Sequence, residues 1–433
     1  MKCSDAPPPQ GIDSGAPYDV AVIGAGPGGS VTAQRIAAAG WRVILFEKSE
    51  YPGKDAVCGG MVGGEDVELF GIDPALVEKK LFRCLCHFAW GSIDLHLRQP
   101  VKSTVLTVQR KNLDRFLAEE AVRSGAELRV RSRVVRVRRI ATGEVAVRFR
   151  HEDDEQEVLA RLVVFADGPL TLAHRSFGIG YHGGDGEVAC AVICDFEFPK
   201  NTVDYFEGFF VREAGATSFG WMFPFADHVN FGMAFLRSEM RKNRRVLQDL
   251  LDFMLRRYEP SSRLTKGRRL LRKRGALIPM KLAKRFHGDS CLVVGDAAGF
   301  VAAMTGVGIT YAMHSGLYAA ETAIEALDKR DFSEAFLARY PRRWRRSRKY
   351  RKLWVMDVLR RGFLLIHRVD PQFMNKVNFF LNIQFFKAQG KGLGFLDGIR
   401  VLFYPLLGRP DLRLVRVSKP RKGAASGNLV KSG

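Results

Sequence analysis

Three glycines close to the N-terminus have the residue type and spacing of a phosphate-binding turn. Gly24, Gly26 and Gly29 follow the short apolar run 18–23, whose composition is typical of a buried parallel strand. In a G-x-G-x-x-G turn the first glycine permits the tight bend, the second lets a pyrophosphate approach the backbone, and the third allows a helix to pack closely on the strand. The helix that starts here would offer free N–H groups and a partial positive charge to that pyrophosphate.

An acid at the end of the next strand completes this pattern. The helix is expected to end near Gly40, and the apolar run 43–46 leads to Glu47, within reach of a ribose hydroxyl. Strand, glycine turn, helix, strand and acid follow in order over about thirty residues, which is more specific than the glycines alone. Because an acid rather than an arginine stands at the ribose position, we expect a dinucleotide without a 2′-phosphate.

Two later strands also end in acids. The run 161–166, which is apolar after Arg161, leads to Asp167, which by itself would be interpreted as an ordinary turn acid. A second apolar run, 291–294, leads to Asp296 in the segment Gly-Asp-Ala-Ala-Gly. Both runs have the composition of buried strands, so both acids are predicted to lie at the edge of a sheet.

The starts of two predicted helices carry further candidate residues. Gly306 and Gly308 precede a helix that we expect to extend to about residue 327. A helix N-terminus stabilises negative charge on a ligand placed before it. Arg110 opens another predicted helix, which ends near residue 123.

Together these segments resemble the flavoprotein family built on the para-hydroxybenzoate hydroxylase architecture, over roughly residues 18–330. The resemblance implies a bound FAD. In that family the glycine turn holds the AMP half, the acid of the Gly-Asp-Ala-Ala segment reaches the ribityl chain and pyrophosphate, and the following helix points N–H groups at the flavin. The cofactor-binding residues that the resemblance implies are Gly24, Gly26, Gly29, Glu47, Arg110, Asp167, Asp296, Gly306 and Gly308.

Two further motifs resemble the geranylgeranyl reductase family, whose members reduce C=C bonds of prenyl chains with reduced FAD. One is Cys58-Gly59-Gly60, and the other is Phe-Gly-Trp-Met-Phe-Pro at 219–224. The family pattern at the second motif is Tyr-x-Trp-x-Phe-Pro, so Phe219 lacks a hydroxyl. The chain also has Ala302 and Ala303 where the family has Asn-Pro, and Val307 where it has Glu. These departures leave open which substrate is used and how polar the flavin site is.

The implied chemistry is hydride transfer from the flavin to one alkene carbon and proton transfer to the other. An alkene has no polar handle, so an apolar channel with an aromatic wall must position it. Trp221 and Phe223 are candidates for that wall, and Cys58 is a candidate proton donor or a guard of the flavin edge. The alternative without a catalytic role is that Trp221 is a core aromatic residue of the sheet and Cys58 a small buried hydrophobic residue. NADPH, a reduced ferredoxin and a quinol all stay open as electron donors.

Two rival functions come from the same residues. Halogenases of this fold have Trp-x-Trp-x-Ile-Pro where this chain has Phe219-x-Trp221-x-Phe223-Pro224, and a related monooxygenase is a similar alternative. A third alternative, which we favour least, is a basic protein that binds nucleic acid and whose flavin site is vestigial. We do not expect nucleic acid as a partner. The seven cysteines have no zinc-binding spacing, so no metal site is predicted.

The expected fold class is α/β plus α+β, with a Rossmann-type FAD-binding domain, an antiparallel-sheet substrate domain and a helical C-terminal region. Four successive strand patterns between 188 and 236 indicate the antiparallel sheet. The predicted divisions are a disordered tail at 1–17, a FAD-binding domain formed by 18–180 with 286–330, a substrate domain at 181–285, a basic helical region at 331–417 and a loose tail at 418–433.

The net charge of +22 indicates an anionic partner. Eight basic residues and no acid lie in 341–352, directly before the mostly apolar stretch 353–366. Phe pairs and other aromatics follow up to residue 404. These features predict an in-plane contact with an anionic membrane surface. There is neither a signal-peptide pattern nor an apolar run of about 18 residues, so we expect a cytoplasmic protein at the inner face of a membrane, with a prenyl lipid as substrate.

Overall fold

The computed structural model describes residues 16–88, 91–96, 105–210, 219–242, 251–252, 254–256, 262–303, 305–366 and 415–418. The N-terminal tail up to residue 15, the aromatic residues at 379–404 and the tail after 418 lie outside these residues. The chain divides into two compact units. The first comprises Met1–Ala56, Gln109–Gly184 and Ile278–Asp357, and the second comprises Val57–Val108, Asp185–Leu277 and Val358–Gly433.

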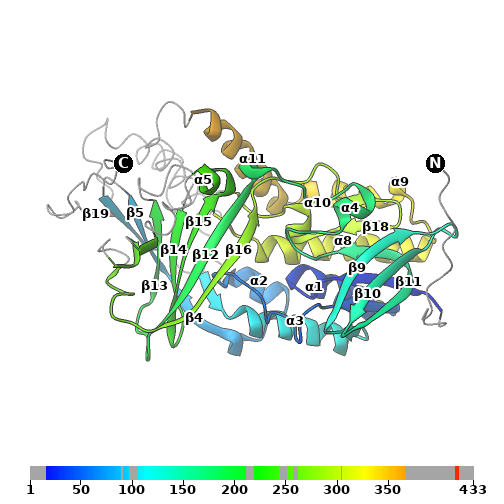
Figure 1. Cartoon of the computed structure of the whole chain (residues 1–433), viewed down its shortest axis with the longest axis horizontal. Helices are drawn as coiled ribbons and strands as arrows, with labels where there is room; N and C mark the ends of the chain where they lie inside the picture. Colours follow the sequence, from blue (N-terminus) through cyan, green and yellow to red (C-terminus); the bar gives the residue numbers. More distant parts are fainter. Residues whose placement is uncertain are drawn as a thin grey trace. The chain divides into compact units, whose positions relative to one another are not determined.

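The first unit is built on a mainly parallel sheet with the strand order β17-β18-β11-β1-β2-β8. Figure 1 labels β9, β10, β11 and β18 of this sheet. Neighbouring strands from β18 to β8 run parallel, and β9 and β10 extend β11 as an antiparallel meander. The strands are β1 Tyr18–Ile23, β2 Val43–Phe46, β8 Glu127–Arg129, β9 Ser132–Arg139, β10 Val145–His151, β11 Asp154–Phe165, β17 His287–Gly288 and β18 Cys291–Val293. The short buried apolar runs predict such a sheet, and the Rossmann-type fold is confirmed.

Three helices of this unit carry or flank the candidate ligand-binding residues. They are α1 Pro27–Ala38, α3 Arg110–Arg123 and α8 Ile309–Lys329, and α1 packs against both of the others (Figure 1). The contact between α1 and α8 is close, because a Cβ added to Gly28 would lie 3.0 Å from the Ala312 carbonyl oxygen. Gly28 and Ala312 both belong to the first turn of their helices, so the N-termini of α1 and α8 lie side by side.

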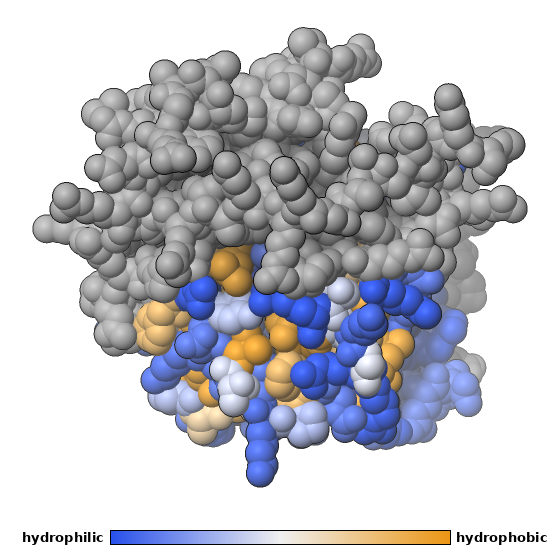
Figure 2. Space-filling model, turned by 90° about the vertical axis from the view of Figure 1, so that its left-hand side faces the viewer, coloured by the Kyte–Doolittle hydropathy of each residue, from blue (hydrophilic) through white to orange (hydrophobic). Residues whose placement is uncertain are grey.

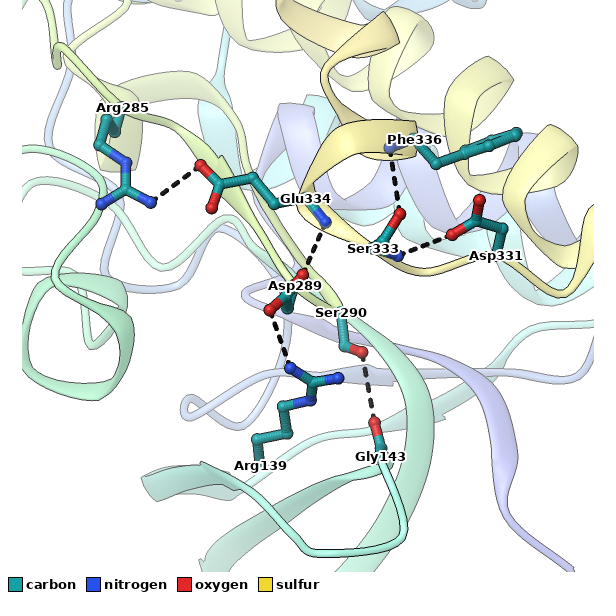
Figure 3. A network of polar contacts seen from close by, with 9 residues as sticks. All are labelled: Arg139, Gly143, Arg285, Asp289, Ser290, Asp331, Ser333, Glu334 and Phe336. Carbon is teal, nitrogen blue, oxygen red and sulfur yellow. Dashed lines mark hydrogen bonds and ion pairs between the residues drawn. The ribbon is translucent and has the colours of Figure 1, made fainter.

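The remaining described helices of this part of the chain are α4 Ala173–Phe177, α9 Glu334–Leu337, α10 Arg339–Arg346 and α11 Arg348–Ile366, with the 3₁₀ turn η5 at Gly295–Ala298. A polar network ties α9 to the sheet (Figure 3). Asp289 accepts hydrogen bonds from Arg139 Nη1 at 2.9 Å and from the Glu334 backbone N–H at 2.7 Å. Ser290 Oγ donates to the Gly143 carbonyl at 3.3 Å. These contacts hold the turn that precedes β18, the strand that leads to Asp296.

The second unit contains a sheet with the order β16-β12-β15-β14-β13-β5-β6-β19 and a small sheet β3-β7-β4. Pairing is antiparallel in the pairs β12–β15, β15–β14 and β14–β13, whereas β13 and β5 run parallel. Its elements are α2 Gly64–Leu69, α5 Arg237–Lys242, β3 Met61–Gly63, β4 Val77–Leu81, β5 Arg83–Phe88, β6 Gly91–His96, β7 Val105–Val108, β12 Val188–Glu197, β13 Tyr205–Phe210, β14 Phe219–Pro224, β15 His228–Leu236, β16 Leu270–Pro279 and β19 Val415–Ser418.

The two faces of this larger sheet have different chemistry. Phe209, Met222 and Phe231 point to one face and belong to an apolar core cluster with Leu251 and Met254. The opposite face carries the side chains that alternate with them along β14 and β15, among them Trp221, Phe223 and Asn230. On the outer surface drawn in Figure 2, the described residues are mostly hydrophilic, with apolar residues in small groups among them.

Two sequence-based expectations differ from the structure. Residues 57–108 were expected within the FAD-binding domain, but they belong to the second unit because β5 pairs with β13 and not with a strand of the parallel sheet. The alternation of apolar and basic residues over 128–138 predicts one half-solvated strand, but that prediction is wrong. It is divided into β8 and β9 because Arg131 adopts a left-handed conformation with φ 52° between them.

Candidate active site

The glycine turn joins β1 to α1, and its three glycines meet different surroundings. Gly24 has φ +101°, and a Cβ there would lie 2.5 Å from the Ala166 carbonyl oxygen. A Cβ on Gly29 would lie 1.9 Å from the Gly24 carbonyl oxygen, so this glycine permits the close packing of helix on turn. A Cβ on Gly26 would meet nothing within 4 Å, which leaves open space in front of the helix N-terminus. That space suits a phosphate group.

Glu47 lies beside this turn because β1 and β2 are parallel neighbours, with Ile23 opposite Phe46. Its buried carboxylate accepts the Ser49 N–H at 2.8 Å and the Ala25 N–H at 3.3 Å. These two contacts fix the carboxylate next to the glycine turn, where a ribose hydroxyl could donate to it.

Asp167 reaches the same region from the other side, since β11 is the second parallel neighbour of β1. One carboxylate oxygen, Oδ2, accepts the Leu172 N–H at 2.7 Å. The other, Oδ1, is buried and has no hydrogen-bond partner among the described residues. Burial raises the pKa of Asp167 above its ordinary value. A buried acceptor atom without a partner is costly, so it fits a site that a ligand donor completes.

Asp296 stands at the N-terminus of α8. A Cβ on Gly308, the residue before the helix, would lie 3.1 Å from Asp296 Oδ1, and no side chain of the described residues caps this helix end. Gly306 adopts φ +70° in the loop that leads to it. Burial raises the pKa of Asp296 to about 6, and the positive charge of Arg110 opposes that shift. Arg110 itself forms a two-point ion pair with Asp114, at 2.8 and 2.7 Å.

All nine predicted cofactor-binding residues therefore belong to the first unit. Arg110 begins α3, and the other eight lie at two kinds of position. The acids stand at the carboxyl ends of parallel strands, and the glycines stand at the N-termini of α1 and α8. Helix N-termini attract phosphates, and carboxylates accept hydrogen bonds from hydroxyls. This donor and acceptor set fits FAD, whose pyrophosphate is anionic and whose ribose and ribityl groups carry hydroxyls.

In the second unit the structure brings the two remaining motifs into contact. A Cβ on Gly59 would lie 2.6 Å from the Phe223 ring and 3.0 Å from Trp221 Nε1. Residues 58–60, called the Cys58 loop below, therefore pack against this aromatic pair. The Trp221 and Phe223 rings have centroids 6.2 Å apart and planes inclined by 25°. Cys58 is half-buried, and its Sγ accepts the Gly60 N–H at 3.4 Å. Gly59, the neighbour of Cys58 in the chain, thus approaches the aromatic row formed by Trp221 and Phe223.

Sequence reasoning missed two polar residues beside this row. Trp221 Nε1 donates to Asn230 Oδ1 at 3.0 Å, and Asn230 Nδ2 donates to Asp195 Oδ1 at 2.6 Å. Both polar residues are buried within strands. The only sequence signal for them is a polar residue inside an otherwise apolar strand, and it does not reveal the partner.

Comparisons with known proteins agree with this geometry. The chain matches the family model described as FAD binding domain over residues 17–348. It is 30% identical over 336 residues to digeranylgeranylglycerophospholipid reductase 1 of Methanopyrus kandleri, covering 76% of this chain and 86% of that protein. Among solved structures, a geranylgeranyl bacteriochlorophyll reductase-like protein of Thermoplasma acidophilum has a TM-score of 0.76 at 22% identity, covering 92% of this chain and 98% of that one.

A flavin-dependent brominase shares the fold with a TM-score of 0.67 at 17% identity, covering 86% of this chain and 96% of that one. At this identity the likeness concerns the fold alone. The family match, the 30% identical reductase and the arrangement of the glycine turn and strand-end acids lead to one conclusion. The chain is a FAD-binding flavoprotein and belongs to the geranylgeranyl reductase family.

Proposed function

We propose that this protein reduces C=C bonds in the prenyl chain of a lipid. The observation that carries the proposal is the contact between the Cys58 loop and the Trp221–Phe223 pair, in a chain similar to a reductase of a digeranylgeranyl lipid. An apolar aromatic row packed against the glycine that follows a thiol suits a substrate that offers no polar group at the bond to be reduced.

In this proposal each residue has a separate role. FAD, when bound and reduced, supplies the hydride. The glycine turn, Glu47 and Asp296 bind and orient the cofactor. Trp221 and Phe223 hold the alkene and exclude water, and the Cys58 thiol delivers a proton to the second alkene carbon. The bond gains one hydride and one proton, and the Cys58 thiolate takes a proton back from solvent. NADPH, two reduced ferredoxins or a quinol return two electrons to the flavin.

The test is an anaerobic incubation of the reduced holoprotein with prenyl lipids, followed by mass spectrometry of the lipid extract. We expect a digeranylgeranyl glycerophospholipid to gain one H₂ for each reduced bond. The Cys58→Ala variant should retain flavin but lose turnover, whereas Cys190→Ala, a matched change at another half-buried cysteine of the second unit, should not. Products that require oxygen or halide instead would favour a monooxygenase or a halogenase.

We further propose that the basic residues after 341 hold the protein on an anionic membrane surface at the inner face of a membrane. Several of these arginines are already engaged: Arg343 pairs with Glu325, and Arg345 lies over the Phe286 ring at 5.3 Å. The exposed ones that support the proposal are Arg342, Arg346, Arg348 and Arg351. Helix α11 also carries Trp354 and Val355, whose exposed fractions are 55% and 44%. Exposed cations beside exposed apolar side chains are typical of an interfacial helix.

No described helix combines the length and the apolar character needed to cross a membrane. Flotation with vesicles at two salt concentrations tests the surface contact. Binding should require anionic lipid and weaken with salt, since each cation near the leaflet contributes about 1 kcal/mol. Changing Arg342, Arg346 and Arg351 to Gln should release the protein, and Arg343→Gln, which removes a paired arginine, should not. Equal binding to neutral vesicles would refute the contact.

A further inference from the structure

The indole of Trp221 is held flat against its own sheet. Trp221 lies opposite Gly232 across the β14–β15 pair, and a Cβ on Gly232 would lie 2.0 Å from Cζ2 and 2.1 Å from Cε2 of the indole. Gly59 approaches the Nε1 edge of the same ring, at 3.0 Å from a Cβ placed on it. The ring therefore rests on one glycine and is bordered by another, so packing limits its tilt but does not by itself fix its rotation in the plane.

A chain of side-chain hydrogen bonds across four adjacent strands restricts this rotation of the indole ring. Trp221 on β14 donates to Asn230 on β15 at 3.0 Å, and Asn230 donates to Asp195 on β12 at 2.6 Å. Arg272 on the edge strand β16 donates its Nε–H to the other Asp195 oxygen at 2.6 Å. The strand order β16-β12-β15-β14 is the order of the four side chains.

Donor and acceptor chemistry allows only one direction for this chain. An indole N–H only donates, so the amide oxygen of Asn230 must face Trp221. The amide nitrogen then faces Asp195, which accepts from it and from Arg272. A flipped Asn230 would place N–H groups against the indole N–H, and it would also set its oxygen against a carboxylate. The interaction that begins at the exposed Arg272 thus determines the orientation of a buried ring.

The cost of burial argues that this chain of contacts has a task beyond packing. Asn230 and Asp195 have exposed fractions of 1% and 5%, and burying such groups is unfavourable unless they are fully paired. The other face of the same strands is filled by apolar residues such as Phe209, Met222 and Phe231. A sheet that needed only a core could have used apolar residues on both faces.

We propose that Asn230, Asp195 and Arg272 are positioning residues that fix the rotation of the Trp221 indole within its plane and so select which double bond of the prenyl chain is reduced. This inference rests on the proposed function. An alkene chain is positioned only by the shape of its walls, so a ring that turns would accept several registers of the chain. These three residues, called the relay below, act on the substrate only through Trp221. Loss of the relay should therefore change which double bond is reduced more than it changes the rate of the chemical step.

The experiment uses the full-length holoprotein labelled with 5-fluorotryptophan. The ¹⁹F spectrum has one signal for each of five tryptophans, and Trp221→Phe identifies the signal of interest. Asn230→Leu, of similar size, should shift or split that signal, and Arg272→Met should do so to a smaller extent. Arg272→Lys keeps a cation at the end of the relay and should restore the signal. Met222→Ala, on the opposite face, lowers stability but should leave the signal in place.

Turnover on a digeranylgeranyl glycerophospholipid gives the second readout. With Asn230→Leu we expect a mixture of partly reduced products in place of the wild-type pattern, KM raised about tenfold and kcat changed less than about twofold. If Asn230→Leu fails to fold, the Arg272 variants carry the test. An unchanged Trp221 signal refutes the relay. An inactive wild-type protein with a shifted signal refutes the proposed function and leaves the relay in place.

Discussion

In the proposed function, the two units of this protein position their ligands by different means. In the first unit the backbone does most of the work, through the glycines of one turn and the N-termini of α1 and α8. In the second unit side chains orient one another across strands, as Asn230 and Asp195 do for Trp221. Backbone sites tolerate no side chain where the ligand lies, whereas a side-chain relay can be weakened step by step. A cofactor common to many reactions suits the first arrangement, and a substrate choice that varies suits the second.

The largest effect is expected at Gly26. A Cβ there meets nothing within 4 Å, so Gly26→Val should fold normally while filling the space before the helix N-terminus. We expect FAD affinity to fall at least about a thousandfold, equivalent to about 4 kcal/mol. Flavin content after purification and titration of the apoprotein measure the change. Gly184→Val is the control, because it also meets open space. Purification of Gly26→Val with full flavin would show that the turn is not the cofactor site.

Asp296 separates cofactor binding from stability in the same unit. Burial raises its pKa from 3.8 to about 6, so the folded state favours the protonated form. The stabilisation from this group is complete below about pH 4 and is lost as pH rises through 6. Asp296→Asn should therefore make the apoprotein more stable at pH 8, by up to about 3 kcal/mol, and change it little at pH 4. It should also weaken FAD binding.

Urea unfolding of both apoproteins at the two pH values measures the stability difference. A variant that is less stable than the wild type at pH 8 would mean that the carboxylate is well solvated in the folded protein. Greater stability of Asp296→Asn at pH 8 would show that the first unit holds a buried acid whose charged form is unfavourable until a ligand binds.

The fold and the first site were largely predictable from local sequence. Strand, glycine turn, helix and acid lie within about thirty residues, so Gly24 to Glu47 could be interpreted without knowledge of strand pairing. The placement of 57–108 could not, since it depends on the pairing of β5 with β13, more than a hundred residues apart. The relay could not either: Asn230 and Asp195 are 35 residues apart in the chain, and only the β12–β15 register brings them opposite each other.

The smallest effect is expected in the surface network of Figure 3. Asp289 pairs with Arg139, and both side chains are about half exposed, at 48% and 46%. Exposed ion pairs contribute between about 0 and 1 kcal/mol, so Asp289→Asn should lower the free energy of unfolding by less than about 1 kcal/mol. Thermal unfolding in low and high salt measures it. A larger loss would mean that the turn before β18 limits stability.

Reduction of the lipid C=C bond can be tested by following the flavin itself in the absence of oxygen. The holoprotein is reduced until its oxidised absorbance disappears, and a digeranylgeranyl glycerophospholipid is then added. We expect the oxidised spectrum to return, with one H₂ gained by the lipid for each flavin reoxidised, and we expect the fully saturated lipid to have no effect. A reduced flavin that no prenyl lipid reoxidises, but that reacts with oxygen to modify another substrate, would refute the proposed reductase function.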